Sequence, residues 1–423
     1  MKQIRKIAIE PDAAELLHRL HRAGYRAYAV GGCVRDSLLG QLPHDWDLCT
    51  SAKPEEVMQL FGAENCIPTG LQHGTVTIRQ NGKLYETTTF RTEGSYSDGR
   101  HPDRVDFVPD VREDLARRDF TINAMACNEE EGLIDPFGGQ EDLAQGIVRA
   151  VGVPVQRFQE DALRILRLYR FAARFGFAID PATGQAAREL CGHLDCVSME
   201  RIEEELSKLL AAPRPGNWME PAVFAAVLPE LDPLGGPERF EKKRQEIDRL
   251  PSGTEGLTTR LAALLEPLGE AGARKALRKL RCSNAVIEET SLLVRESGLT
   301  PEQDGLRMQA KRLLGRLKPE QLQKLIRLCA AERPEQADDL ESLRIEAERL
   351  VAEQACCRVA DLAVNGRDLI ALGVRPGPGL RQVLDALLEA VVTEQLPNEK
   401  KPLLDAAKRF FCVLTREKTC GSI

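Results

Sequence analysis

Two aspartates separated by one residue are the side chains of this sequence best suited to bind a metal ion. Asp45 and Asp47 flank Trp46 in the stretch 44–49, which we expect to be a strand. Residues two apart on a strand face the same way, about 7 Å apart, so both carboxylates can converge on one cation. Hard oxygen ligands without nearby cysteine or histidine suit Mg²⁺. Glu86, on a later predicted strand, either adds a third carboxylate or is an ordinary exposed acid.

A pair of glycines upstream of the aspartates offers a place for an anion. Gly31 and Gly32 follow a predicted strand and precede a short predicted helix, so backbone amides and the positive helix end can approach a phosphate. Arg35, one turn into that helix, can donate two hydrogen bonds to a phosphate. The same glycine pair is also typical of a plain tight turn. The aspartates that follow favour a metal-bound nucleotide at this place.

The elements that must position these residues form an α+β unit. Alternating and turn patterns predict strands joined by short helices, with a tight hairpin closed by Asn81 and Gly82. The expected helices are 13–23, 32–39 and 54–61, and the expected strands are 25–30, 44–49, 74–79 and 83–91.

The chain changes character after Asp142, where strand signals almost vanish and apolar residues recur at helical spacing. Helices are expected over 161–174, 199–210, 258–268 and 311–328. A proline-rich stretch, 213–237, interrupts the series, and a turn at 375–379 separates two later helices. We therefore predict four regions: an α+β head (1–145), a helical neck (146–212), a helical body (213–330) and a helical tail (331–423).

Composition describes a soluble globular chain of 423 residues, long enough for two to four domains. Aromatic residues are 5%, which favours a largely helical chain. The 12 cysteines include no C-x-x-C pair, so we expect reduced thiols. No window approaches the roughly 18 apolar residues of a membrane span, and no secretory signal is evident, so we expect a cytoplasmic protein. The net charge of -7 argues at first against a nucleic-acid partner.

Five motifs occur in the order typical of class II nucleotidyltransferases, the family of CCA-adding enzymes and bacterial poly(A) polymerases. The residues 361–369, 376–379 and 397–399 resemble the tail of the shorter bacterial CCA-adding enzymes. Some relatives append a metal-dependent phosphohydrolase domain, which we do not expect here because all six histidines lie at or before His193. The five motifs are Gly31-Gly32-Cys-Val-Arg35-Asp36, Asp45-x-Asp47, Arg117-Arg118-Asp119-Phe-Thr-Ile-Asn123-Ala, Asp135-Pro-Phe-Gly-Gly139 and Glu160-Asp161-Ala-Leu-Arg164.

The resemblance implies a role for each candidate residue. Asp45 and Asp47 would bind Mg²⁺ in a catalytic site that also includes Glu86, and would thereby activate the primer 3′-hydroxyl and neutralise the departing pyrophosphate. Nucleotide contacts are implied for Gly32, Arg35, Arg118, Asp161, Arg164, Arg167 and Arg170.

The polar stripe at 161–170 suits the recognition of two bases. Its spacing alone is also typical of an exposed, salt-bridged helix face. Cytosine and adenine both carry an exocyclic amino donor beside a ring-nitrogen acceptor, which match the Asp161 carboxylate and the Arg164 guanidinium. Uracil and guanine place a carbonyl where the amino group would be, so an acceptor would face an acceptor. Arg167 and Arg170 would lie toward the phosphates or the RNA end.

The stretch 89–102 is rich in Gly, Ser and Asp and reads as a mobile loop. In the family that the chain resembles, a loop at this place is associated with the switch from C to A addition. Relatives that add only CC have it shortened, and here its length is typical of the full loop. An enzyme that adds only the terminal A remains an alternative.

The sequence therefore predicts addition of C, C and A to the 3′ end of tRNA from CTP and ATP, with Mg²⁺ as cofactor. A poly(A) polymerase and a non-catalytic RNA-binding protein are the rival hypotheses, and the oligomeric state stays open between monomer and homodimer. Two groups of basic residues, within 274–281 and 307–316, are either tRNA contacts or solvated helix faces. The net charge is no obstacle, because 157–174 carries five arginines against Glu160 and Asp161.

Overall fold

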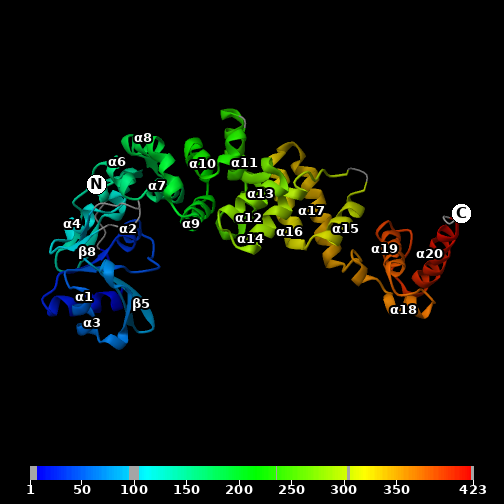
Figure 1. The fold of residues 1–423 in the computed structure, drawn as a ribbon, viewed down its shortest axis with the longest axis horizontal. Helices are drawn as coiled ribbons and strands as arrows, with labels where there is room; N and C mark the ends of the chain where they lie inside the picture. The colour runs from blue at the N-terminus through cyan, green and yellow to red at the C-terminus, as the bar shows by residue number, and fades with distance from the viewer. Residues whose placement is uncertain (1–6, 95–103, 235, 303–304, 421–423) are drawn as a thin grey trace. The chain divides into compact units, whose positions relative to one another are not determined.

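A computed structural model describes residues 7–94, 104–234, 236–302 and 305–420 (Figure 1). The chain forms two compact units. The first comprises Met1–Leu257 with Ala276–Cys282, and the second comprises Thr258–Lys275 with Ser283–Ile423. The first unit contains a mixed sheet followed by helices and the second is helical, which confirms the predicted α+β head with helical regions after it.

The head is built on a sheet of seven described strands in the order β3-β4-β5-β2-β1-β8-β9. The pair of β2 and β5 is parallel and the other neighbours are antiparallel, so the sheet is mixed. Further short pairs join β6 to β7 and β10 to β11. The strands are β1 Ala27–Val30, β2 Leu48–Thr50, β3 Cys66–Gly70, β4 Thr75–Gln80, β5 Lys83–Thr89, β6 Arg91–Glu93, β7 Val105–Phe107, β8 Ala126–Asn128, β9 Gly132–Ile134, β10 Ile147–Val148 and β11 Ala178–Ile179.

Amphipathic helices bury their apolar sides against this sheet. Leu16, Leu17 and Leu20 of α1 are buried, as the 3.6-residue period requires. A further cluster joins Tyr28 and Phe90 of the sheet region to Leu115 of α4. The helices of the head are α1 Pro11–Arg22, α2 Gly32–Leu38, α3 Pro54–Phe61, α4 Val111–Ala116 and α5 Gly139–Gln145.

The remaining helices of the first unit follow the sheet in sequence (Figure 1). Ten of the thirteen residues of α7 are buried, including Arg164 and Arg170, because α9 packs along this helix. The helices are α6 Pro154–Glu160, α7 Leu163–Phe175, α8 Pro181–Leu190, α9 Met199–Leu210, α10 Pro221–Val227 and α11 Pro237–Arg249.

The second unit is an array of helices, and two of them, α12 at its start and α13 at its C-terminal end, are shared with the first unit. Its last helices enclose an apolar cluster that includes Leu369, Val383, Leu387 and Leu403. The helices are α12 Gly253–Leu265, α13 Gly269–Lys279, α14 Asn284–Glu296, α15 Leu306–Arg316, α16 Pro319–Glu332, α17 Ala337–Ala352, α18 Gly366–Ala371, α19 Pro378–Val392 and α20 Lys400–Cys420.

Several local predictions are confirmed. The helix over 54–61 has the predicted bounds, and the hairpin of β4 and β5 is closed by Asn81 and Gly82 with φ angles of 48° and 78°. The ten cysteines whose side chains are described are free. No helix in the described part of the chain is long and apolar enough to cross a membrane.

Three predictions of local structure differ from what the chain forms. The strand expected over 44–49 is β2, Leu48–Thr50, so the aspartate pair precedes it. The helix expected over 311–328 is two helices, because Pro319 cannot continue α15 and instead begins α16. The helix expected from Asp161 begins at Leu163, and the proline-rich stretch lies inside the first unit. The division into four regions stays a prediction.

Candidate active site

A cleft of about 370 Å³ lies in the first unit, lined by strands of the sheet, by the segment after α4 and by helices α7 and α9. Its ionisable lining is almost entirely arginine and carboxylate. Six arginines against four acids make the cleft basic, although the whole chain has a net charge of -7. The arginines are Arg91, Arg117, Arg118, Arg164, Arg167 and Arg201, and the acids are Asp47, Glu86, Asp119 and Asp161.

The two metal-site aspartates lie in an extended segment just before β2. The Val30 amide donates to the Asp47 carbonyl at 2.9 Å, which prolongs the pairing of β1 and β2 by one residue. Asp45 and Asp47 face solvent, whereas Trp46 between them is 7% exposed. The alternation of an extended chain thus places both carboxylates on one side, as the sequence predicts.

Glu86 adds a third carboxylate next to this pair. The parallel register of Leu48 with Thr87 sets Glu86 beside Asp47. Desolvation in the cleft raises the pKa of Asp47, and the charges of Glu86 and Asp45 raise it further, against the opposing effect of Arg118. No described group of three or more metal-ligating side chains is already gathered as a metal site. Like charges held this close fit a divalent cation, because the cation would relieve their repulsion.

Gly31 makes room for an arginine of the cleft. It has a φ of 80°, and a Cβ at this position would lie 2.8 Å from Nη1 of Arg118. Glycine is therefore required both by the backbone and by the close approach of the guanidinium. Nε of Arg118 is buried and has no hydrogen-bond partner within the described residues, while Nη2 lies 3.5 Å from Asp114. Arg118 thus retains donor capacity beside Asp47.

Arg35, for which the sequence predicts a phosphate contact, is buried in this structure. Its side chain is 5% exposed, donates to Asp36 and Asn123, and packs on the rings of Phe171 and Phe175. It does not line the cleft. These charged and aromatic partners hold α2 to α7 and to Asn123, and the phosphate contact of Arg35 stays a prediction. Gly32 also lies outside the cleft lining, at the first turn of α2, which has no side-chain cap.

Asp114 orients the arginine pair that follows it. The carboxylate is 1% exposed and accepts from Nε and Nη2 of Arg117 at 3.0 and 2.9 Å. Burial raises its pKa, but Arg117 and Arg118 outweigh this effect, so the pKa of Asp114 is lowered. The sequence motif did not single out this acid, although its position three and four residues before the arginines on a helix is a detectable signal.

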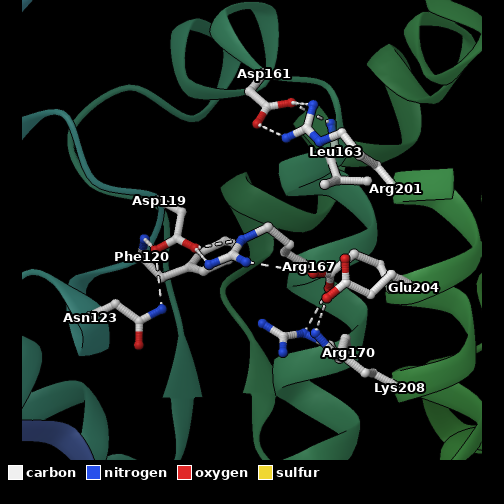
Figure 2. Close-up of polar contacts among 11 residues, drawn as sticks. Asp119, Phe120, Asn123, Asp161, Leu163, Arg167, Arg170, Arg201, Glu204 and Lys208 are labelled. Atoms are coloured by element: carbon white, nitrogen blue, oxygen red, sulfur yellow. Dashed lines mark hydrogen bonds and ion pairs between the residues drawn. The ribbon is translucent and has the colours of Figure 1, made fainter. Parts of the chain in front are cut away.

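Asp119, the third residue of the same motif, is bound to the neck helix α7. It accepts from Nε and Nη2 of Arg167 at 2.9 and 2.6 Å and from the Asn123 amide at 3.1 Å (Figure 2). Asp119 is 8% exposed. Burial raises its pKa, but the charge of Arg167 and these hydrogen bonds outweigh it and hold the pKa at about 2. Arg167 therefore has a structural partner in Asp119, in addition to the nucleotide contact that the sequence predicts.

Glu205 of α9 forms ion pairs with Arg167 and with Arg170, which both lie on α7. It lies 3.5 Å from Nη1 of Arg167 and 2.7 Å from Nε of Arg170. Burial lowers the pKa of Arg170 to about 10, with Glu205 opposing the decrease. Arg170 packs over the Phe171 ring and does not line the cleft. Arg170 is thus a buried partner of α9 in this structure, and its nucleotide contact stays a prediction.

Asp161 and Arg164 both line the cleft, but they do not pair with each other. Asp161 accepts from the guanidinium of Arg201 on α9 (Figure 2). Arg164 donates to Glu160 at 2.6 Å and to the carbonyls of Arg157 and Arg117 at 3.1 and 2.9 Å. Arg201 and Glu205 were missed in the sequence. Their spacing of four residues on a predicted helix was visible, but nothing local connects them to Asp161 or Arg167.

The predicted mobile loop is described only in part. Residues 95–103 lie outside the described residues, and the flanking strands β6 and β7 pair with each other. Arg91, at the start of β6, reaches the cleft lining.

The basic residues of 307–316 are largely compensated by carboxylates. Arg307 pairs with Glu346, Glu353 and Glu394, and Lys311 also binds Glu394. These pairs join α15 to α17 and to the end of α19. The protein's own carboxylates therefore already neutralise these two cations, and no RNA phosphate is needed to explain them. In the other basic group, Arg274 pairs with Glu288, whereas Lys275 and Arg278 are exposed.

Three family models match successive parts of the chain. The Poly A polymerase head domain matches residues 27–149, "Probable RNA and SrmB-binding site of polymerase A" matches 176–234, and tRNA nucleotidyltransferase domain 2 matches 255–407.

Whole proteins match over nearly the full chain. A CCA-adding enzyme of Lactiplantibacillus plantarum is 38% identical over 402 residues, 94% of this chain and 95% of that protein. A CCA-adding enzyme of Geobacillus stearothermophilus is 36% identical, over 97% of this chain and 98% of its own. The crystal structure of the Bacillus stearothermophilus CCA-adding enzyme in complex with CTP superposes with a TM-score of 0.76 at 33% identity, covering 97% of this chain and 100% of that one.

Proposed function

This chain belongs to the family of bacterial CCA-adding enzymes, and on that premise we propose how its cleft divides the work of nucleotide addition. The enzyme adds cytidine, cytidine and adenosine to the 3′ end of tRNA from CTP and ATP, without a nucleic-acid template, and releases pyrophosphate. One observation carries the assignment of residues. The same cleft holds Asp47 and Glu86 from the sheet and Asp161 and Arg164 from the neck, so a reacting triphosphate and a base have separate partners.

Asp45 and Asp47 bind the divalent metal on which the family depends, and we propose that it is Mg²⁺. Glu86 lies beside them and completes the catalytic carboxylates. Bound Mg²⁺ would lower the pKa of the primer 3′-hydroxyl and offset the charge of the departing pyrophosphate. Desolvation and the charges of Glu86 and Asp45 raise the pKa of Asp47 against the effect of Arg118, and this supports the proposal because a bound cation would relieve the repulsion.

Arg118 is the triphosphate contact that the geometry supports best. Its guanidinium faces the cleft beside Asp47 and keeps an unpartnered Nε within the described residues. Gly32 contributes its backbone amide at the start of α2. Arg35 supports this turn indirectly, because its hydrogen bond to Asn123 holds α2 in place. Arg167 lies between the base and phosphate partners and is held by Asp119.

Asp161 and Arg164 read the base. Three of the five N–H groups of Arg164 already donate to described partners, which leaves donors for a ring nitrogen. The Asp161 carboxylate accepts from the exocyclic amino group of cytosine or adenine. A carbonyl in that position would face an acceptor, so UTP and GTP are rejected.

A single-nucleotide assay tests the function. The protein is incubated with Mg²⁺ and tRNA lacking CCA, with each nucleotide alone and with CTP and ATP together, and product lengths are resolved. Growth by three nucleotides that requires both CTP and ATP is the expected result. Long tails made from ATP alone would replace it with polyadenylation, one A added only to tRNA ending in CC would indicate an A-adding enzyme, and binding without growth would indicate a non-catalytic RNA-binding protein. A tRNA substrate also leads us to infer a cytoplasmic location.

A further inference from the structure

We propose that Arg201 is a positioning residue for base selection, which holds the Asp161 carboxylate so that one defined acceptor faces the incoming base. This inference rests on the proposed base-reading role of Asp161. It concerns a different helix, α9, whose residues carry none of the five sequence motifs.

The hydrogen bonds of Asp161 leave it little freedom. A carboxylate has about four lone-pair positions. Oδ1 accepts from the Leu163 amide at 3.1 Å and from Nη1 of Arg201 at 3.3 Å, and Oδ2 accepts from Nη2 of Arg201 at 2.7 Å. Within the described residues, Oδ1 is therefore full and Oδ2 keeps one lone pair. The two-pronged contact also sets the plane of the carboxylate, so the direction of that lone pair is fixed.

Arg201 is itself held in place by the packing of its helix. Its side chain is 23% exposed, and Glu205, one turn further along α9, binds Arg167 and Arg170 of α7. Figure 2 shows Arg201 directed at Asp161. The ion pairs of Glu205 with Arg167 and Arg170 add a charged contact between α9 and α7. Ion pairs as well as apolar contacts therefore fix the position of α9 along α7.

Base choice depends on the single lone pair that Oδ2 of Asp161 keeps for the incoming nucleotide. One fixed acceptor matches one N–H of the exocyclic amino group of cytosine or adenine, and it opposes the carbonyl of uracil or guanine. Without Arg201, Asp161 keeps only the Leu163 amide, which lies near its own backbone, and the carboxylate can rotate and recruit water. The amino group then finds no preoriented partner, and a carbonyl can be accommodated through water.

A double-mutant cycle tests the proposal. Arg201→Met, Asp161→Ala and the double variant are compared with the natural protein for the ratio of kcat/KM with CTP to that with UTP, on tRNA lacking CCA. We expect Arg201→Met to lower this ratio by roughly tenfold or more, and the double variant to match Asp161→Ala. Arg201→Lys should recover only part of the ratio, because a point charge cannot make the two-pronged contact.

Controls separate positioning from a general loss of structure. Lys208→Met removes a cation of the same helix that pairs with the exposed Glu204, and the ratio should not change. Thermal melting and tRNA binding establish that each variant folds. As a second measurement, CTP is compared with the triphosphate of 2-pyrimidinone riboside, which lacks the amino group, and Arg201→Met should lose most of the preference for CTP.

Two outcomes overturn the proposal. If Arg201→Met still lowers the ratio in the Asp161→Ala background, Arg201 acts on the nucleotide directly and not through Asp161. If Asp161→Ala relaxes the ratio but folded Arg201→Met and Arg201→Lys keep it, Arg201 is only structural. Failure of the proposed function is distinguishable, because the natural protein would then show no preference for CTP and ATP over UTP and GTP.

Discussion

The cleft has two ends that use the same residue types in opposite ways. At the sheet end, Asp45, Asp47 and Glu86 form no ion pair among the described residues, and their mutual repulsion contributes to the raised pKa of Asp47. At the neck end, Asp119 and Asp161 are both bound by arginines, and the pKa of Asp119 falls to about 2. The acids proposed to bind the metal thus form no ion pair in the described part of the chain, whereas Asp119 and Asp161 are paired with arginines of the protein itself.

The sharpest test of this contrast removes one uncompensated acid. Asp47→Ala should lower incorporation of both CMP and AMP by on the order of 1000-fold, because the metal loses a ligand, while tRNA binding is retained. Incorporation is measured on tRNA lacking CCA, and Glu129→Gln, an exposed acid on the hairpin of β8 and β9, is the matched control. Substantial activity in the variant would remove Asp47 from the metal site.

Removing a compensated acid should change selectivity instead of the chemical step. Asp161→Ala should bring UTP incorporation to within about tenfold of CTP incorporation, because the acceptor that opposes a carbonyl is lost. Relative kcat/KM values for the two nucleotides measure this, with Glu204→Gln of α9 as the control. Undiminished rejection of UTP would contradict the base-reading role.

The buried carboxylate at the neck end should also contribute to acid stability. Asp119 titrates near 3.8 when unfolded and at about 2 when folded, so its contribution is present above about pH 4 and is lost as the pH falls toward 2. That contribution is on the order of 2 kcal/mol. Urea unfolding across this range should show a steeper loss for the natural protein than for Asp119→Asn. Parallel curves for the two proteins would count against the pairing with Arg167.

The smallest expected effect concerns the glycine beneath Arg118. Gly31→Ala should raise KM for both nucleotides several-fold and cost about 1–2 kcal/mol of unfolding free energy, because the methyl group meets Nη1 at 2.8 Å and φ is positive. Gly132→Ala is a matched control with a φ of 75° and no atom within 4 Å of the new Cβ. Equal effects on KM in both variants would mean that Arg118 is not displaced.

Much of this site was predictable because its residues lie in short motifs with strong local geometry. The glycine turn, the alternation around Trp46 and the helix over 199–210 follow from φ preferences and periodicity. The phosphate contact of Arg35 and the nucleotide contact of Arg170 stay predictions, because spacing places a residue on a helix but does not say which side is buried. Both side chains lie outside the cleft lining, whereas Arg164 and Arg167 reach it.

The sequence by itself determined the family, the mixed-sheet head and the positions of the aspartate pair, since each is encoded within a few neighbouring residues. Only the tertiary structure decided which charges compensate each other. The decisive pairs join Asp161 to Arg201 and Asp119 to Arg167 across 40 and 48 residues, with partners on different elements. Ion pairing depends on distance in space. The fold brings the two members of each pair to 2.7 Å and 2.6 Å, whereas Asp45, Asp47 and Glu86 form no ion pair within the described residues.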